Sequence, residues 1–199
     1  MKIFPVFVSS VLALSCLDAT AKSDNFSYDY GQVGYYFSND TNVKGGLTFN
    51  TSYDIYDHVN ILGSYSFSLR SDHKAPDKYK TKTYSLGIGY HTSLDEYMDK
   101  TDIFATLGLL NTHTSVTTAG VNRKANDSGR IIALGLRKVL SDKMELLVRV
   151  DKPSVPVSDT LFTLGLLYKY SKTTKLGLNF NTGADDGSEV LNASVRWSF

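Results

Sequence analysis

The alternation of apolar and polar residues constrains the fold of this chain more than any other feature. In one stretch, Leu176, Leu178 and Phe180 are separated by single glycine or asparagine residues. Side chains of a strand point to opposite faces with a period of two, so this pattern predicts a strand with one apolar and one polar face. Similar segments, separated by polar turn residues, predict ten strands at about 26–38, 43–55, 59–70, 79–92, 102–115, 128–140, 143–152, 160–170, 174–183 and 188–199.

The polar faces of these segments distinguish a membrane barrel from a soluble barrel or sandwich. They consist mostly of Gly, Ser, Thr and Asn rather than Lys and Glu, and such small residues suit the crowded interior of a narrow closed sheet. No apolar run after the N-terminus approaches the roughly 20 residues of a membrane helix. A chain that spans a bilayer without such helices must form a closed barrel. We therefore expect an all-β, closed antiparallel up-and-down transmembrane β-barrel.

The first segment is the least regular of the ten. It has two rows of apolar or aromatic residues on opposite faces: Val33, Tyr35 and Phe37 on one, and Tyr28, Tyr30 and Tyr36 on the other. A β-bulge moves the following residues to the opposite face, so we expect a bulge or register shift between Tyr30 and Val33.

The last nine residues, 191–199, alternate strictly and end on Phe199. This ending resembles the C-terminal strand of Gram-negative outer-membrane β-barrel proteins, in which an alternating segment finishing in Phe is read by the outer-membrane assembly machinery. The resemblance implies location in the cell outer membrane, an assembly signal at Val195, Trp197 and Phe199, and the assembly machinery, outer-membrane lipid and lipopolysaccharide as partners. The oligomeric state stays open, with a monomer favoured.

Residues 1–21 have the features of a cleaved secretory signal peptide. Lys2 precedes an apolar stretch over 3–17, and Ala19-Thr20-Ala21 is a small-x-small cleavage site. Lipoprotein processing at Cys16 is the alternative, although Ala13-Leu14-Ser15 is a poor lipobox. Cleavage after residue 21 removes the only cysteine, which excludes disulfides and Cys-ligated zinc.

Residues 22–199 then form one barrel domain. An even number of strands places both ends of the barrel in the same compartment, as bacterial barrels require. An eight-stranded barrel is the alternative, if two segments between 143 and 183 do not span the membrane. Aromatic residues gather near the expected periplasmic strand ends, as in an interfacial girdle: Tyr53, Tyr56, Tyr90, Tyr97, Tyr168, Tyr170, Trp197 and Phe199. The outer connectors, including 116–127, are expected to be short polar loops.

Charged residues on the polar faces are the main candidates for a functional site. They are Lys44, Asp54, Arg70, Arg137, Glu145, Arg149, Asp151, Lys169 and Arg196. Charges in a confined lumen are costly unless they are paired or hydrated, so they either form an ion-pair network or line a water-filled path. Because Glu145, Arg149 and Asp151 share one face of a strand and Arg137 lies on the preceding strand, cross-strand ion pairing is the simpler interpretation.

A narrow passive pore for small solutes is the expected function. A structural or surface-interaction barrel, adhesin-like and without transport, is the alternative, and an outer-membrane hydrolase is less favoured. The catalytic candidates are His73 beside Asp72, His113 two residues before Ser115, and Asp185-Asp186. Neither the His-x-Ser-Asn motif of lipid A deacylases nor the paired Asp/His motifs of outer-membrane proteases is present. We therefore expect no enzyme activity, no catalytic residues and no cofactor.

Two further classes of function have little support. The histidines His58, His73, His91 and His113 lack the spacing of metal ligands, so no metal site is expected. The net charge is +1 and the chain has no run of like charges. It thus lacks the basic stripe on which nucleic-acid binding depends.

Overall fold

The structure is a computed structural model that describes residues 26–39, 43–71, 77–118, 121–154, 160–184 and 187–199. The predicted signal peptide lies outside these residues. No helix long and apolar enough to cross a membrane occurs in the described part. The ten strands are β1 (Tyr30–Ser38), β2 (Val43–Tyr56), β3 (Val59–Ser71), β4 (Asp77–Ser93), β5 (Thr101–Thr118), β6 (Val121–Ser141), β7 (Met144–Pro153), β8 (Leu161–Lys169), β9 (Thr174–Gly183) and β10 (Glu189–Ser198).

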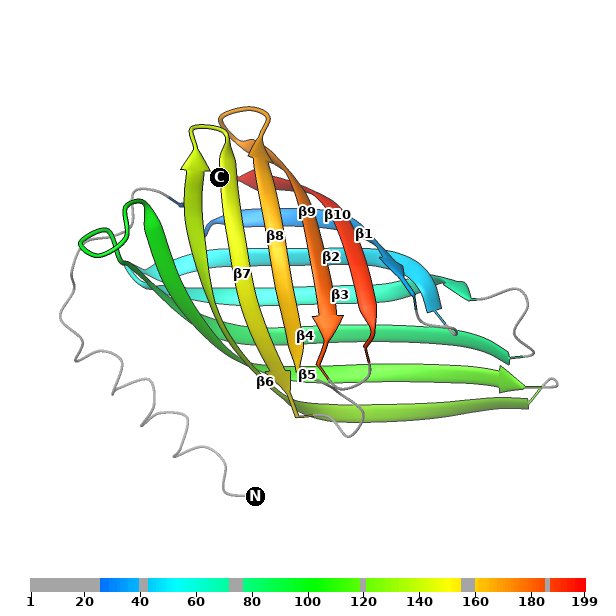
Figure 1. Cartoon of the computed structure of the whole chain (residues 1–199). Helices are drawn as coiled ribbons and strands as arrows, with labels where there is room; N and C mark the ends of the chain where they lie inside the picture. Colours follow the sequence, from blue (N-terminus) through cyan, green and yellow to red (C-terminus); the bar gives the residue numbers. More distant parts are fainter. Residues whose placement is uncertain (1–25, 40–42, 72–76, 119–120, 155–159, 185–186) are drawn as a thin grey trace, which may run out of the picture.

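The strands form one closed antiparallel barrel (Figure 1). Each strand pairs with its neighbours in sequence, and β1 closes the barrel against β10, with Val33 opposite Val195. Links of two to seven residues, such as Asp57-His58, connect neighbouring strands at the end where the chain enters and leaves the barrel. The predicted ten-stranded up-and-down barrel is therefore confirmed, and the eight-stranded alternative is excluded.

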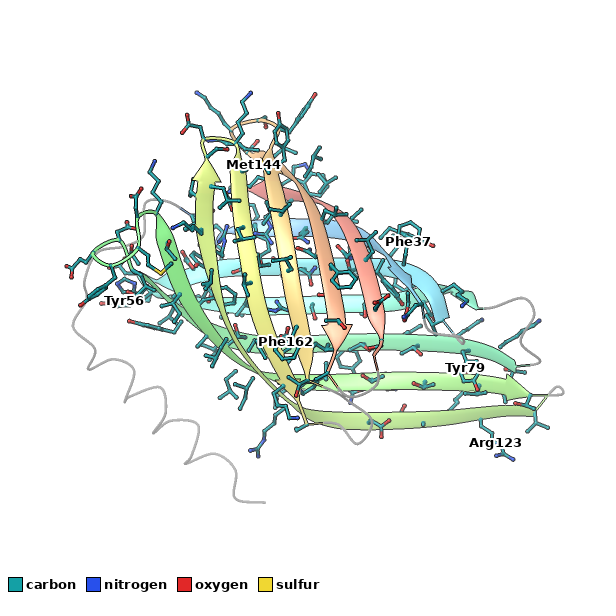
Figure 2. The ribbon with its side chains drawn as sticks, in the orientation of Figure 1. Phe37, Tyr56, Tyr79, Arg123, Met144 and Phe162 are labelled. Atoms are coloured by element: carbon teal, nitrogen blue, oxygen red, sulfur yellow. The ribbon has the colours of Figure 1, made fainter. Side chains whose placement is uncertain are left out.

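Burial in this barrel is inverted relative to a soluble protein, because apolar side chains cover the outside and polar ones fill the inside (Figure 2). Leu86 and Leu134 are 63% and 58% exposed, whereas Asn60 and Asp102 are 4% and 0% exposed. Without lipid such an exterior would be a large apolar patch, but in a bilayer it faces hydrocarbon. The predicted apolar face of the ninth strand is confirmed, because Leu176, Leu178 and Phe180 are 44%, 50% and 42% exposed on the outside.

The prediction of a bulge in the first segment is wrong. Pairing of β1 with both of its neighbours runs without a shift from Tyr30, and the register shifts in this region lie between β2 and β3 instead. β1 also begins at Tyr30 rather than at residue 26, because Phe26 to Asp29 turn into the lumen, where Phe26 and Tyr28 are buried. The second aromatic row therefore faces the lumen instead of marking a change of register.

The prediction of a short polar loop over 116–127 is also wrong. β5 continues to Thr118 and β6 already begins at Val121. These strands and β4 extend well past their neighbours in Figure 1. We call residues 77–82 of β4, 112–118 of β5 and 121–130 of β6 the outer sheet. Pairing of β6 with β7 begins only at Ile131 opposite Pro153.

The opposite end of the barrel carries exposed aromatic side chains. Tyr56, Tyr97 and Tyr170 are 74%, 83% and 73% exposed, and Trp197 and Phe199 point outward from the end of the chain. The resemblance to outer-membrane barrels predicts that the end at which the chain enters and leaves the barrel faces the periplasm, and we call it the periplasmic end. The same resemblance predicts that the outer sheet projects from the cell surface.

Candidate functional site

Buried charges meet inside the barrel near its periplasmic end, and we call this group the lumen cluster. Its centre is Glu145 of β7. Arg137 of β6 donates from Nη2 to Glu145 Oε2 at 2.9 Å, and Lys175 of β9 donates from Nζ to Glu145 Oε1. The three residues are at most 9% exposed. Both oxygens of one carboxylate are thus engaged by cations, one from β6 and one from β9.

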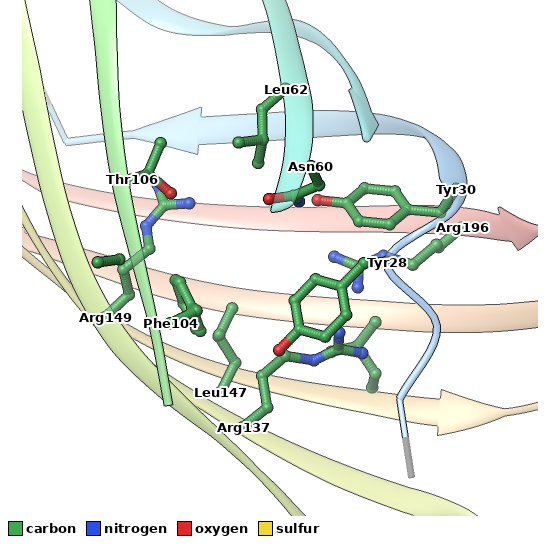
Figure 3. A pocket seen from close by; sticks show the side chains of 12 residues that line it. Tyr28, Tyr30, Asn60, Leu62, Phe104, Thr106, Arg137, Leu147, Arg149 and Arg196 are labelled. Atoms are coloured by element: carbon green, nitrogen blue, oxygen red, sulfur yellow. The ribbon is translucent and has the colours of Figure 1, made fainter. Parts of the chain in front are cut away.

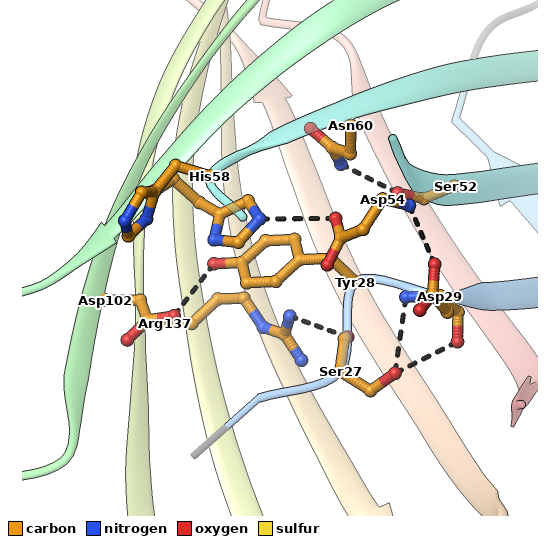
Figure 4. Close-up of polar contacts among 10 residues, drawn as sticks. Ser27, Tyr28, Asp29, Ser52, Asp54, His58, Asn60, Asp102 and Arg137 are labelled. Atoms are coloured by element: carbon orange, nitrogen blue, oxygen red, sulfur yellow. Dashed lines mark hydrogen bonds and ion pairs between the residues drawn. The ribbon is translucent and has the colours of Figure 1, made fainter. Parts of the chain in front are cut away.

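The segment from Phe26 to Asp29 packs against Arg137 of this ion-pair network (Figure 4). The guanidinium carbon of Arg137 lies 4.5 Å from the Phe26 ring centroid and 4.9 Å from that of Tyr28. Arg137 Nη1 donates to the Ser27 carbonyl oxygen at 3.3 Å, and the Tyr28 hydroxyl donates to Asp102 Oδ2 at 3.2 Å. Burial raises the pKa of the Tyr28 hydroxyl, so this group remains a protonated donor.

Histidine and aspartate side chains hold the other side of the segment. The Tyr28 ring stacks on the His91 ring with the centroids 3.6 Å apart. His91 Nε2 lies 3.2 Å from Asp54 Oδ1, and the Asp54 backbone N–H donates to Asp29 Oδ1 at 2.7 Å. The His58 Nδ1 donates to the His91 carbonyl oxygen at 3.0 Å. Contacts from β2, β4, β5 and β6 therefore fix the segment across the lumen.

Arg196 of β10 belongs to the same buried region and bridges the closure between β1 and β10. Its Nε donates to Gln32 Oε1 at 2.8 Å, and its guanidinium lies 4.0 Å from the centre of the Tyr30 ring. Gln32 in turn donates to Ser194 Oγ at 3.1 Å. These contacts explain why tyrosine faces the lumen here, since an aromatic face stabilises a guanidinium group that has little water around it.

A cavity of about 70 Å³ lies beside the lumen cluster (Figure 3). Arg137, Arg149 and Arg196 line it together with Tyr28 and Asn60. Small-molecule sites usually measure roughly 300–1,000 Å³. The cavity therefore has room for a few water molecules or a small ion.

Most of the predicted lumen charges lie where the alternation places them. Arg137, Glu145, Asp151 and Arg196 are buried, and Asp54 is largely so. Arg137 and Glu145 form the expected pair between neighbouring strands, whereas Arg149 Nε donates to Asp151 Oδ2 of the same strand at 2.8 Å.

Two of the predicted charges with described side chains do not join the lumen cluster. Lys169 shares the lumen-side face of β8 with the buried Thr163 and Leu167, but it is exposed at the periplasmic end of the strand. Lys44 is half-buried near the outer end of β2. The Arg70 side chain lies outside the described part of the chain.

The sequence interpretation did not single out Lys175, Asp102 and Tyr28. The alternation could have indicated Lys175, because it lies on the same polar face as Gly177 in the ninth strand. Tyr28 lies in the second aromatic row of the first segment, which the sequence alone explains by a bulge. Asp102 stands at the first residue of the predicted fifth strand, where the side of the strand is poorly defined.

His113 and Ser115, the catalytic candidates within the described residues, do not form the hydrogen-bonded serine–histidine pair of a hydrolase. His113 Nε2 lies 3.1 Å from the Tyr84 hydroxyl oxygen, and Nδ1 pairs with Asn126 Oδ1. Ser115 donates to Asn122 at 2.8 Å instead of to the histidine. His73, Asp72 and Asp185-Asp186 lie outside the described residues. Within those residues, no group of three His, Cys, Asp or Glu side chains is arranged to hold a metal ion.

Comparison with known families agrees with this architecture. The model of the outer membrane protein beta-barrel domain matches residues 7–199. The chain belongs to this family. The protein is accordingly an integral outer-membrane β-barrel, as its inverted burial requires. A search of curated proteins found no match.

Several solved outer-membrane barrels have similar structures. The attachment invasion locus protein Ail of Yersinia pestis is 14% identical, with a TM-score of 0.46 over 84% of this chain and 97% of Ail. The KdgM porin in complex with disordered oligogalacturonate is 7% identical, with a TM-score of 0.50 over 85% of this chain and 99% of the porin. The N-terminal barrel domain of Pseudomonas aeruginosa OprF is 13% identical, with a TM-score of 0.44 over 87% and 100% of the two chains. At these identities the similarity concerns the fold alone.

Proposed function

We propose that this protein is a surface-interaction barrel that binds an extended polypeptide along the edge of its outer sheet and keeps its lumen closed to solutes. The observation that carries the proposal is the extension of β4, β5 and β6 beyond the rest of the barrel. The nine residues Val121–Gly129 correspond to about 30 Å of strand at roughly 3.3 Å per residue.

The exposed edge of β6 suits the addition of another strand. Within the described residues, 121–129 pair with β5 on one side only. The unpaired backbone N–H and C=O groups of such an edge can bind an extended chain, and neighbouring side chains then select its sequence. Arg123 on this edge is exposed and favours a segment that contains acidic residues.

The lumen cluster supports the second part of the proposal. A solute that passed the periplasmic end would have to displace Tyr28 from His91 and separate Arg137 from Glu145. Breaking a buried ion pair leaves an uncompensated charge, which costs several kcal/mol. The packing of Phe26 to Asp29 therefore favours a closed lumen.

A narrow pore for small solutes is the second candidate. It is supported by the cavity beside Arg149 and Arg196 and by the small polar residues that line the remaining lumen, such as Ser64, Ser85 and Thr163. In this function the lumen cluster would be the constriction that sets conductance.

Two measurements on the full chain test the proposal. The first is adhesion of bacteria that display the protein to beads coated with an unfolded acidic polypeptide, compared with beads coated with the folded form. A variant with residues 114–125 replaced by Asn-Gly keeps His113 and Asn126 beside a two-residue turn and removes most of the edge. We expect adhesion to the unfolded coat to be lost in this variant, and equal adhesion of both proteins would overturn the proposal.

The second measurement is single-channel conductance of the purified protein in a planar bilayer. We expect no channels from the wild type or from the shortened variant. Regular channels from the wild type would support the pore and contradict the closed lumen.

A further inference from the structure

One face of the outer sheet is strongly cationic. Alternation continues from the barrel wall, where Tyr84, Leu109 and Ile132 face lipid and are 44%, 56% and 53% exposed. The residues that follow on the same face, which we call the lipid-side face, include Lys78, Lys80, Lys82, His113, Lys124 and Arg130. The Thr83–Thr112 hydrogen bond at 3.2 Å marks the opposite, lumen-side face.

The cations of the outer sheet gather on its lipid-side face. Five of its six Lys and Arg residues lie on the lipid-side face, and Arg123 is the sixth. Asp127, the acidic residue of the outer sheet whose side chain the structure describes, lies on the lumen-side register. An ordinary solvated surface mixes the two signs. Within the described residues the five cations form no ion pair with a carboxylate.

Hydrogen bonds between strands fix the polar side chains that lie between the lysines on the lipid-side face. His113 contacts Tyr84 and Asn126, Ser115 donates to Asn122 at 2.8 Å, and Asn111 donates to Ser128 at 2.6 Å. These polar side chains therefore hydrogen-bond with one another. The lysine ammonium groups above them remain exposed to the surroundings.

The register brings three lysines around one point. Lys80, Ser115 and Lys124 stand opposite one another on β4, β5 and β6, so the two lysine backbones are about 10 Å apart at roughly 4.8 Å per strand. Lys82 follows Lys80 by two residues, about 7 Å along β4. Flexible lysine side chains from these positions can reach a single phosphate group above Ser115.

The position of this face identifies the kind of ligand. Its cations begin directly where the lipid-facing apolar residues end, with Lys82 following Tyr84 and Arg130 following Ile132 on the same faces. This level corresponds to the headgroups of the outer leaflet. We propose that Lys80, Lys82 and Lys124 bind phosphate groups of lipopolysaccharide, at the lipid A part of the molecule. This inference is independent of strand addition at the β6 edge.

The test compares two variants of equal charge change in the full-length protein. Lys80, Lys82 and Lys124 are changed to Gln in one variant, and the exposed periplasmic Lys100, Lys143 and Lys172 in the other. Each protein is reconstituted in phosphatidylcholine nanodiscs, and binding of bisphosphorylated lipid A and of its dephosphorylated form is measured by native mass spectrometry. Resistance of the barrel to sodium dodecyl sulfate before boiling verifies folding in every sample.

We expect lipid A to bind the outer variant about a hundredfold more weakly than the wild type, since each lysine near an anionic surface contributes roughly fivefold. The periplasmic variant and Arg123→Gln on the lumen-side face should match the wild type. Equal binding of all proteins, equal loss in both triple variants, or equal binding of dephosphorylated lipid A would overturn the proposal. The proposal would also be overturned if the outer variant lost binding to soluble dextran sulfate but still bound lipid A as the wild type does. The lysines would then bind a soluble anionic polymer instead of lipid A.

Discussion

Removal of the central carboxylate of the lumen cluster should strongly destabilise the barrel. Glu145→Gln keeps the size of the side chain but removes the charge that Arg137 and Lys175 share. Breaking a buried ion pair costs roughly 3–5 kcal/mol. Arg137 keeps its contacts with the Phe26 and Tyr28 rings and the Ser27 carbonyl, so we expect the lower end, about 3 kcal/mol, or a factor of about 150 in the folded-to-unfolded ratio.

Reversible urea unfolding in lipid vesicles measures this effect. Trp197 is the single tryptophan of the chain, and it is 47% exposed on the lipid side, so its fluorescence reports departure from lipid. Glu96→Gln is the matched control, because Glu96 is exposed in the turn between β4 and β5, and it should change the free energy of unfolding by less than about 0.5 kcal/mol.

A double variant separates the ion pairs from a general effect of the substitution. Glu145→Gln combined with Lys175→Met removes one of the two uncompensated cations, so we expect it to be more stable than Glu145→Gln alone. If Glu145→Gln unfolds at the same urea concentration as Glu96→Gln, the lumen cluster is fully hydrated and the reasoning for a closed lumen fails.

Two further predictions concern assembly and the lumen. Deletion of Phe199 or Phe199→Asp should reduce insertion into the outer membrane far more than Ser198→Ala, measured as the fraction of heat-modifiable barrel in membrane fractions; equal insertion would refute the assembly signal. Tyr28→Ala should produce small channels in a planar bilayer, because Tyr28 stacks on His91 and donates to Asp102 across the lumen. The control is Tyr90→Ala on the lipid-facing side. If Tyr28→Ala forms no more channels than this control, other groups close the barrel.

The alternation of the sequence predicted the barrel wherever a strand separates lipid from lumen. It failed in the outer sheet for a physical reason. Beyond the bilayer neither face needs apolar residues, so Thr114, Ser115 and Lys124 give no periodic hydrophobic signal, although β5 and β6 pair over their full length. In the sequence such a strand is hard to distinguish from a polar loop.

The candidate site could be predicted as a set of faces but not as a set of contacts. The side of a strand follows from the alternation, which placed Arg137, Glu145 and Arg196 in the lumen. Their partners depend on the register between strands and on segments that leave the sheet. The pairing of Lys175 with Glu145 spans 30 residues, and the Tyr28 contact with Asp102 spans 74, distances at which no local pattern is informative.

The closure between β1 and β10 sets the order in which the barrel can be completed. Arg196 binds Gln32 across 164 residues of sequence, so this contact forms only after the intervening hairpins have brought the two ends together. Loop-closure entropy makes such a contact late. The ring of Tyr30 covers Arg196, and Tyr30 comes directly after the segment from Phe26 to Asp29. The segment that fills the lumen is therefore anchored in the same step that seals the wall, and an unsealed barrel stays open to water until its last strand has docked.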